Sequence, residues 1–401
     1  MTTYFNKQSL ANFVGKYWHI LFLICLSLLP VVWFLGKGEA IINGVDTNFP
    51  LDPKMFFLRR FYMWNNLGNS GHDFSFAPAG IFFHLIQLIP YLLGLSLQNV
   101  EKISLIFWFG VIVLNSYLFS GNFLKQKLYR VLFVTLYALN IYMFNSWENI
   151  KVANLSLVAG IPLLLHIFVR LKNDLIGKSR AFGEIIFVSF ILAGSGINPA
   201  YFITAIIILF VFTLSFCLLD KNIKKPSKTF LFIVMIILIL SAYWVIPTIS
   251  FILRNVTQGE SISSIGFNNW LNSLSENTSI VNVLRGQGAW DWYAFDSLTK
   301  APLFLPYTPN YFYRITFILF SFMVPSIALL ALIFRNIDKN KYYLPFSILL
   351  VLGIFLGSGT HEPIGSFFRW LTNHLPYFSL FRSPWYIFTP MLTLSLAGLT
   401  A

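Results

Sequence analysis

The chain has 401 residues, of which 57% are hydrophobic and 11% are charged. Soluble domains carry about 25% charged residues, so this composition excludes a soluble globular domain. The net charge of +13 comes from 28 Lys and Arg residues, which fall in short clusters between apolar runs. Such clusters orient membrane proteins, whereas a nucleic-acid-binding surface gathers them along one face. We therefore expect no nucleic-acid partner.

The apolar runs predict an all-α integral membrane protein with a single membrane domain covering residues 1–401. About 20 apolar residues cross the hydrocarbon core, and we count ten such spans. They are 18–36, 102–120, 130–146, 153–169, 182–197, 200–219, 229–249, 312–334, 342–358 and 385–401. The first is longer than the roughly 7–15 apolar residues of a signal peptide, which predicts a retained anchor. Cys25 and Cys217 lie inside apolar runs and predict neither a disulfide nor a metal site.

One further apolar stretch, 77–97, is interrupted by prolines and glycines. Such breakers are typical of a broken or re-entrant segment. If the stretch does not cross and the N-terminus is cytoplasmic, all four basic clusters between spans fall on the cytoplasmic side, as the positive-inside rule requires. These clusters lie within 125–130, 170–180, 221–228 and 335–341. A crossing at 77–97 would move all of them outside, so we predict a re-entrant segment.

This topology places three long segments on the outer face of the membrane. They are 37–101, 250–311 and 359–384, and most of the acidic residues lie in or near them. We therefore expect the chemistry at the outer face. The last apolar run ends at Ala401, which predicts that the sequence is truncated at its C-terminus.

The first outer segment contains the candidate catalytic residues Asp46 and Asp52, followed by Arg59 and Arg60 in an aromatic, amphipathic stretch. This composition is typical of a helix lying in the membrane interface. A carboxylate there could act as a general base, and arginines at the same depth could hold a lipid-linked phosphate. The alternative is that both aspartates are turn residues.

Two later outer segments contain further candidates for binding. Arg285 stands in a Gly-rich, aromatic segment with Trp290, which suits a loop closing over a sugar ring. An interfacial aromatic belt is the alternative. Arg382 lies where the last span enters the membrane and could hold a phosphate or a lipid headgroup.

Four short motifs carry a family resemblance. They are the Asp-rich loop leading to Trp64-Asn65, the broken segment after Phe76-Ala77-Pro78, Ala193-Gly194-Ser195-Gly196-Ile197-Asn198-Pro199, and Leu284-Arg285-Gly286-Gln287-Gly288-Ala289-Trp290 preceded by Tyr243-Trp244-Val245-Ile246-Pro247. On these motifs the chain resembles the GT-C superfamily of membrane glycosyltransferases. More narrowly, it is similar to the N-terminal membrane domain of the alpha-(1→3)-arabinofuranosyltransferase family of actinobacterial cell-wall synthesis.

The resemblance implies an inverting transfer of a sugar, possibly arabinofuranose, from a polyprenyl-phosphate donor to a cell-envelope glycan acceptor. It names no certain cofactor beyond this lipid-linked donor. Asp46 would be the general base, with Asp52 the competing candidate. The donor phosphate would be held by Arg59, Arg60, Arg285 and Arg382. Other GT-C enzymes, such as mannosyltransferases, are the nearest alternative. A lipid or polysaccharide flippase is a second one, although ionisable residues are scarce within the spans.

Overall fold

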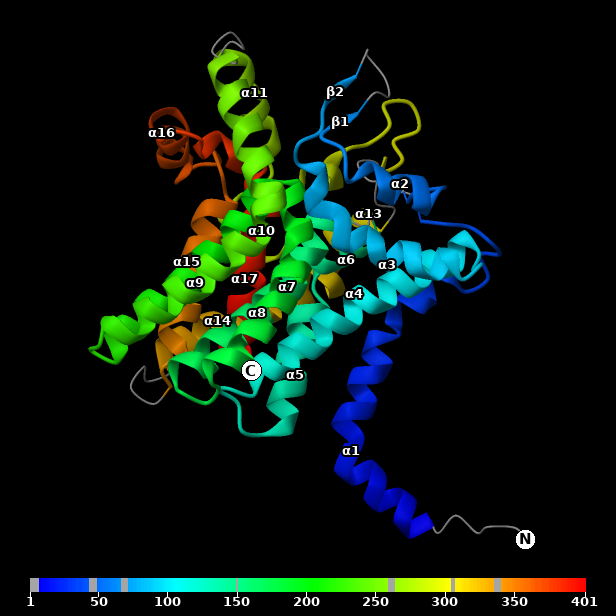
Figure 1. Ribbon diagram of the computed structural model, residues 1–401, viewed down its shortest axis with the longest axis vertical. Coiled ribbons are helices and arrows are strands. Elements are labelled where there is room, and N and C mark those ends of the chain that lie inside the picture. Colours follow the sequence, from blue (N-terminus) through cyan, green and yellow to red (C-terminus); the bar gives the residue numbers. More distant parts are fainter. Residues whose placement is uncertain are drawn as a thin grey trace.

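The computed structural model describes residues 7–42, 49–65, 71–148, 151–258, 264–303, 307–334 and 340–401. This part of the chain is almost entirely helical (Figure 1). The α-helices are α1 (Lys7–Ser27), α2 (Pro53–Arg59), α3 (Ile81–Leu92), α4 (Leu97–Ser120), α5 (Lys127–Ala138), α6 (Ile141–Glu148), α7 (Val152–Lys172), α8 (Lys178–Ala193), α9 (Pro199–Leu219), α10 (Lys224–Gln258), α11 (Ser264–Ser275), α12 (Ile280–Leu284), α13 (Thr308–Tyr313), α14 (Ile315–Phe334), α15 (Tyr343–Gly357), α16 (Gly365–His374) and α17 (Pro384–Thr400).

Short 3-10 helices and one small hairpin complete the described elements. The 3-10 helices are η1 (Leu29–Phe34), η2 (Ala77–Gly80), η3 (Gly194–Ile197), η5 (Trp290–Tyr293) and η7 (Phe378–Phe381). The hairpin pairs β1 (Trp64–Asn65) with β2 (His72–Asp73) in antiparallel register.

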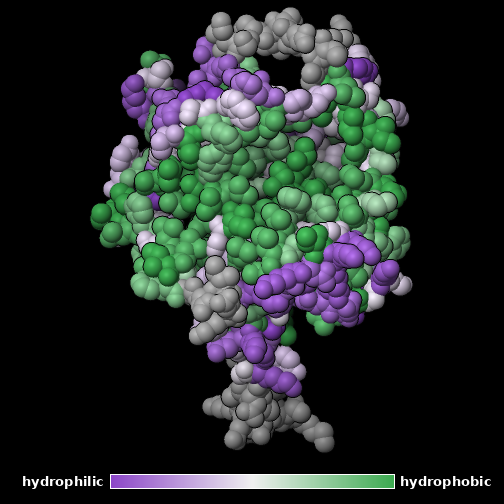
Figure 2. All heavy atoms as spheres, turned by 90° about the vertical axis from the view of Figure 1, so that its left-hand side faces the viewer, coloured by the Kyte–Doolittle hydropathy of each residue, from purple (hydrophilic) through white to green (hydrophobic). Residues whose placement is uncertain are grey.

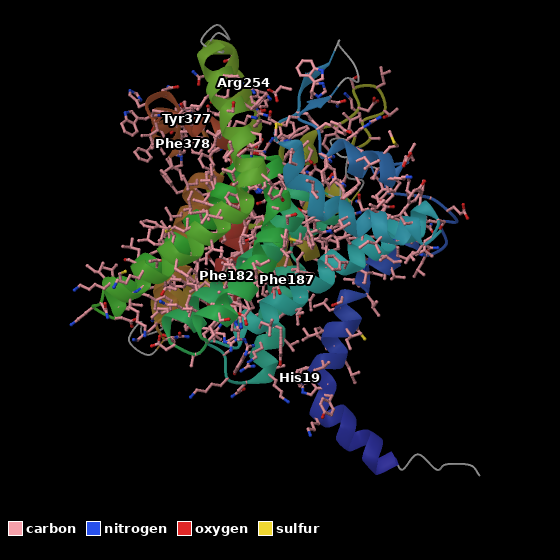
Figure 3. The ribbon with its side chains drawn as sticks, viewed as in Figure 1. His19, Phe182, Phe187, Arg254, Tyr377 and Phe378 are labelled. Atoms are coloured by element: carbon pink, nitrogen blue, oxygen red, sulfur yellow. The ribbon has the colours of Figure 1, made fainter. Side chains whose placement is uncertain are left out.

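In the part of the chain that the structure describes, seven helices are long and apolar enough to cross a membrane. These spans are Gly15–Phe34, Leu97–Ser120, Val152–Lys172, Lys178–Ile197, Pro199–Leu219, Lys224–Arg254 and Ile315–Phe334. Figure 2 shows the matching surface, on which a broad hydrophobic belt lies between hydrophilic ends. Phe182 and Phe187 of α8 lie at mid-height of the bundle and are 47% and 48% exposed (Figure 3). The chain is therefore a multi-pass, all-α membrane protein, as the sequence predicts at this level.

Two predicted spans are shorter or interrupted in the structure. Helix α15 contains 15 residues of the predicted span 342–358, whereas α17 has 17 residues and matches the length predicted for 385–401. The predicted span 130–146 is divided into α5 and α6 because Asn140 ends one helix and begins the next. Its Nδ2 donates to the carbonyl of Tyr137 at 2.6 Å, and its Oδ1 accepts the N–H of Met143 at 3.0 Å. An asparagine side chain that bonds local backbone groups in this way competes with a continuous helix.

Helix α7 is the centre of the bundle, and 94% of its apolar stretch is buried. Its Pro162 cannot donate to the carbonyl of Val158, four residues earlier. The buried Tyr137 hydroxyl of α5 donates to that carbonyl at 2.9 Å. Pro390 of α17 frees the carbonyl of Tyr386 in the same way, and the hydroxyl of Tyr142 in α6 donates to it at 2.9 Å. A neighbouring helix therefore supplies each missing hydrogen bond, as a membrane interior requires.

The predicted basic clusters meet at one end of the bundle wherever the structure describes them. Asp220 pairs with Lys172 and Lys341, both at 2.5 Å, and so joins three connections between helices. Lys127 donates to the carbonyl of Lys16 at 3.3 Å, which joins the connection before α5 to α1. The opposite end carries α2, the hairpin, α11, α13 and α16 (Figure 1). With 21 residues, α7 separates the two ends by about 30 Å, the thickness of a hydrocarbon core.

Candidate functional site

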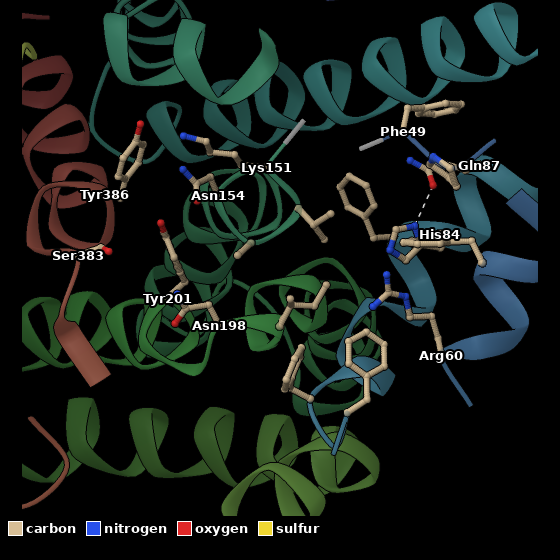
Figure 4. Close-up of a pocket in the computed structure, with 18 of the residues that line it drawn as sticks. Phe49, Arg60, His84, Gln87, Lys151, Asn154, Asn198, Tyr201, Ser383 and Tyr386 are labelled. Carbon is tan, nitrogen blue, oxygen red and sulfur yellow. Dashed lines mark hydrogen bonds between the residues drawn. The ribbon is translucent and has the colours of Figure 1, made fainter. Parts of the chain in front are cut away.

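A cavity of about 550 Å³ lies at the end of the bundle opposite the basic connections. Its wall combines the predicted first outer segment with the first turns of several long helices. The lining residues are Phe49, Pro50, Phe56, Arg60, Phe74, Phe76, Phe83, His84, Gln87, Lys151, Val152, Ala153, Asn154, Ile197, Asn198, Tyr201, Trp290, Ser383 and Tyr386. Figure 4 shows two polar groups of side chains on opposite sides. We call the group of Arg60, His84 and Gln87 the arginine wall. The other group contains Lys151 and Tyr386, and together with Asp291, which contacts both of them behind the lining, we call it the lysine wall.

Arg60 is the central charge of the arginine wall. It is 7% exposed, and its guanidinium lies 4.4 Å from the ring centre of Phe56 and 5.4 Å from that of Phe74. Burial lowers the pKa of Arg60 to about 10, so the side chain stays charged at neutral pH. No carboxylate among the described residues pairs with it, and its Nε atom is buried without a hydrogen-bond partner there. Buried charges are normally paired, so this cation is suited to an anionic ligand.

His84 lies beside Arg60 in α3. Burial, followed by the charge of Arg60, lowers the pKa of His84 to about 3, so its ring is neutral. The ring's Nδ1 is 2.8 Å from Oε1 of Gln87, while the buried Nε2 has no partner in the described part of the chain. A neutral ring that donates from Nδ1 leaves Nε2 as a hydrogen-bond acceptor. The arginine wall therefore offers a cation and a neutral acceptor side by side.

The lysine wall is a buried network built from the N-cap of α7, from η5 and α17, and from a residue of α6 that bonds to it. The Lys151 ammonium lies 3.6 Å from Oδ2 of Asp291 and 3.8 Å from the ring centre of Tyr386. The Tyr386 hydroxyl donates to the same Oδ2 at 2.6 Å and accepts from Asn145 at 2.7 Å. The other oxygen of Asp291, Oδ1, is buried with no partner among the described side chains. Oδ2 of Asp291 is thus held in place, whereas Oδ1 remains able to accept a hydrogen bond.

Three long helices begin at the cavity. Lys151, Asn198 and Ser383 are the N-cap residues of α7, α9 and α17, and all three line it. The Asn198 side chain accepts the N–H of Ala200 at 3.3 Å, and Pro199 occupies the first helical position, a normal N-terminal pattern. The N-terminus of a helix carries roughly half a positive charge. Three such ends make this side of the cavity electropositive without any further cation.

Glycines in two of the sequence motifs allow close packing around the cavity. A Cβ atom on Gly196 would lie 2.5 Å from the Trp244 ring, and one on Gly288 would lie 2.3 Å from Trp385. Gly286 has φ +74°, a conformation that favours glycine. These motif residues therefore have a structural role in setting the positions of η3 and of the segment leading to Trp290.

The predicted site residues of the first outer segment lie in different environments. Asp46 lies outside the described residues, in a segment that ends at Phe49 in the cavity wall. Asp52 caps α2 by accepting the N–H of Met55 at 2.9 Å and is exposed. Arg60 lines the cavity, whereas Arg59 is exposed and lines a separate hollow beside α2.

The chain before Asp46 is held by the start of α4. The buried Glu101 accepts the N–H of Ile42 at 2.8 Å, and Gln98 donates to the carbonyl of Ala40 at 3.1 Å. The chain up to Ile42 is therefore held at α4, and the next described residue, Phe49, lies in the cavity wall.

The structure separates the other predicted binding residues. Trp290 lines the main cavity. Arg285 lies in a second cavity of about 280 Å³ between α5, α14 and α17, where its Nε donates to Ser321 at 2.7 Å. Arg382 stacks on Trp270, with 5.0 Å between the guanidinium and the ring centre. Arg60 and Trp290 are thus brought to one cavity, and Arg285 and Arg382 are not among its lining residues.

The lysine wall was missed by the sequence reasoning. Lys151 carried a usable signal, because it is a basic residue between two apolar runs on the predicted outer side, where the positive-inside rule disfavours it. Asp291 and Tyr386 carried none, since the contacts that join them to Lys151 depend on the tertiary fold.

The fold and this cavity define a multi-pass helical membrane protein with a polar, electropositive pocket at one end of its bundle. In comparisons with protein-family models, curated proteins and solved structures, no match was found. Among the described residues, no three His, Cys, Asp or Glu side chains come close enough to hold a metal ion.

Proposed function

We propose that this chain is a GT-C-type glycosyltransferase of a prokaryotic plasma membrane. It transfers a sugar, with arabinofuranose the first candidate, from a polyprenyl-phosphate donor to a cell-envelope glycan on the outer face. One observation carries the proposal: a buried Arg60, which no carboxylate of the described residues pairs, faces a cavity at which three helix N-termini also meet. Helix N-termini and arginine are the groups that proteins use to bind phosphate.

The topology proposed with this function has ten crossings. Helices α5 and α6 together make one crossing, and the short α15 and α17 make two more. Segment η2–α3 then enters the membrane without crossing it, and the N-terminus is cytoplasmic. The ion pairs that gather basic connections at one end support this orientation, because positively charged loops stay in the cytoplasm. The cavity then opens on the outer side.

The proposed reaction uses the arginine wall to bind the donor phosphate. A carboxylate takes the proton of the acceptor hydroxyl, whose oxygen attacks the anomeric carbon. The bond between that carbon and the phosphate oxygen breaks, and the lipid phosphate leaves with the electron pair. Arg60 stabilises the charge that develops on the leaving phosphate, where preorganised groups are most effective. Asp46 is the preferred base because the side chain of Asp52 is engaged in capping α2.

Two adjacent arginines provide a matched test in membranes supplied with labelled polyprenyl-phosphate sugars. Arg60→Gln removes the buried cation from the cavity, whereas Arg59→Gln removes the same charge from the exposed side of α2. We expect Arg60→Gln to reduce transfer by at least about 100-fold, as for other preorganised groups that stabilise charge. Arg59→Gln should stay within about threefold of the wild type.

The base assignment is tested in the same assay by comparing Asp46→Asn with Asp52→Asn. Asp46→Asn should abolish transfer, whereas Asp52→Asn should retain most of it because asparagine also caps helices.

Equal activity of Arg60→Gln and wild type with every sugar donor would refute the proposed phosphate site. A transfer of mannose instead of arabinofuranose would leave the reaction class intact and change only the sugar.

A further inference from the structure

A second electropositive feature lies at the opposite, basic end of the bundle. It is a hollow of about 800 Å³ between the α7–α8 and α9–α10 connections. Four lysines line it, namely Lys178, Lys224, Lys225 and Lys228, and we call it the lysine hollow. Asp174 is the one acid among its described lining residues, and it is paired with Lys225. Among the residues that the structure describes, the lining therefore keeps an excess of three positive charges.

The local helix electrostatics make this excess unfavourable without an anion. Helices α8 and α10 begin at Lys178 and Lys224, and neither has an acidic residue in its first turn. The N-terminus of a helix is itself positive, so lysines there oppose the helix dipole, which favours acidic residues at this position. A bound anion would offset both the dipoles and the ammonium groups. The sequence thus concentrates like charges where helix stability alone would select against them.

The apolar surroundings indicate what kind of anion fits. Leu171, Ile176 and Phe232 line the hollow together with the lysines. Beyond it, α10 presents Leu231 and Met235, which are 56% and 60% exposed, along the hydrophobic belt. A ligand with a charged head and apolar chains can contact both surfaces at once, whereas a small soluble anion would contact only the lysines.

We propose that the lysine hollow binds the phosphate headgroup of an anionic glycerophospholipid, with the acyl chains lying along α10. Basic pockets between helices at the cytoplasmic surface are suited to such headgroups. This inference depends on the membrane-spanning fold and not on the proposed glycosyl transfer. The lipid binds in the leaflet opposite the main cavity.

The test uses the purified full chain in neutral detergent, with lipid binding measured by native mass spectrometry. Dioleoyl phosphatidylglycerol should bind, and dioleoyl phosphatidylcholine should bind at least about tenfold more weakly. The variant Lys178→Gln/Lys224→Gln/Lys228→Gln leaves the Asp174–Lys225 pair intact. It should weaken phosphatidylglycerol binding by about fivefold for each lysine, or about a hundredfold in all. Equal binding of the two lipids by the wild type would overturn the proposal.

A matched control removes three lysines from the same end of the molecule but outside the hollow. Lys16→Gln/Lys125→Gln/Lys127→Gln should change phosphatidylglycerol binding by less than about threefold. If the control weakens binding as much as the hollow variant does, the effect is general surface charge and the proposal fails. Displacement of the lipid by inorganic phosphate or ATP at similar concentrations would assign the hollow to soluble anions instead, and would also overturn it.

A variant expected to bind the lipid more tightly gives a result that misfolding cannot produce. Asp174→Asn removes the acid in the hollow and releases Lys225 to the ligand. Asp174 has φ 55°, a conformation that asparagine also adopts readily, so the loop should keep its shape. We expect phosphatidylglycerol to bind at least about threefold more tightly. Unchanged or weaker binding would contradict an anion site in the hollow.

Discussion

Two tyrosine hydroxyls donate to backbone carbonyls that prolines leave free, and these hydrogen bonds between helices allow a quantitative test of the packing around the cavity. Tyr142 is 1% exposed, and its hydroxyl donates to the carbonyl that Pro390 frees at Tyr386, at 2.9 Å. Tyr142→Phe keeps the ring and leaves this buried carbonyl without its donor. An unsatisfied buried group costs about 1–3 kcal/mol, and hydrogen bonds between membrane helices contribute up to about 1.7 kcal/mol. We expect a loss of about 1–2 kcal/mol.

A double-mutant cycle isolates this hydrogen bond from other effects of the substitution. Pro390→Ala restores an N–H group four residues after Tyr386, and the helix can then satisfy the carbonyl itself. In that background Tyr142→Phe should cost less than about 0.5 kcal/mol, giving a coupling of roughly 1 kcal/mol. The free energies would come from reversible unfolding in mixed micelles. An equal loss in both backgrounds would refute the assignment of the hydroxyl to the proline-freed carbonyl.

Two further substitutions test the cavity walls by the same unfolding measurement. Lys151→Met should destabilise the protein by about 2 kcal/mol or more, because it leaves the buried Asp291 carboxylate without its cation. Adding Asp291→Asn should recover part of that stability. No recovery would argue against an ion pair between the two side chains. Gly288→Ala should cost about 1–3 kcal/mol of stability because its Cβ would lie 2.3 Å from Trp385. The control Gly183→Ala should not destabilise the protein, because no atom lies within 4 Å of the added Cβ. Equal effects of the two substitutions would contradict the close packing at Gly288.

The fold could be predicted from the sequence wherever local composition decides it. The predicted spans 153–169 and 200–219 lie within α7 and α9, because long uncharged apolar runs have few alternatives to a transmembrane helix. The division of 130–146 was not predicted. Asparagine is tolerated inside apolar helices, and only the observed bonds of Asn140 to Tyr137 and Met143 reveal a break.

The candidate site was predictable only in part. The sequence singled out both arginines as candidates for phosphate binding and left Arg59 and Arg60 equivalent. The direction in which each side chain leaves the end of α2 decides that Arg60 is buried and Arg59 is exposed. The lysine wall depends on contacts such as the hydrogen bond from Tyr386 to Asp291, which lie 95 residues apart. A single sequence gives no information on such pairs. The position of Asp46 beside the cavity stays a prediction.

The unequal helix lengths have a consequence for the surrounding bilayer. Helix α15 has 15 residues, which is about 22 Å of helix, whereas α4 has 24 residues and a length of about 36 Å. A hydrocarbon core of about 30 Å is too thick for the first and too thin for the second. Such hydrophobic mismatch is relieved by tilting the protein and by thinning the lipid locally. We therefore expect this chain to sit obliquely in the membrane, with its thinnest lipid annulus beside α15.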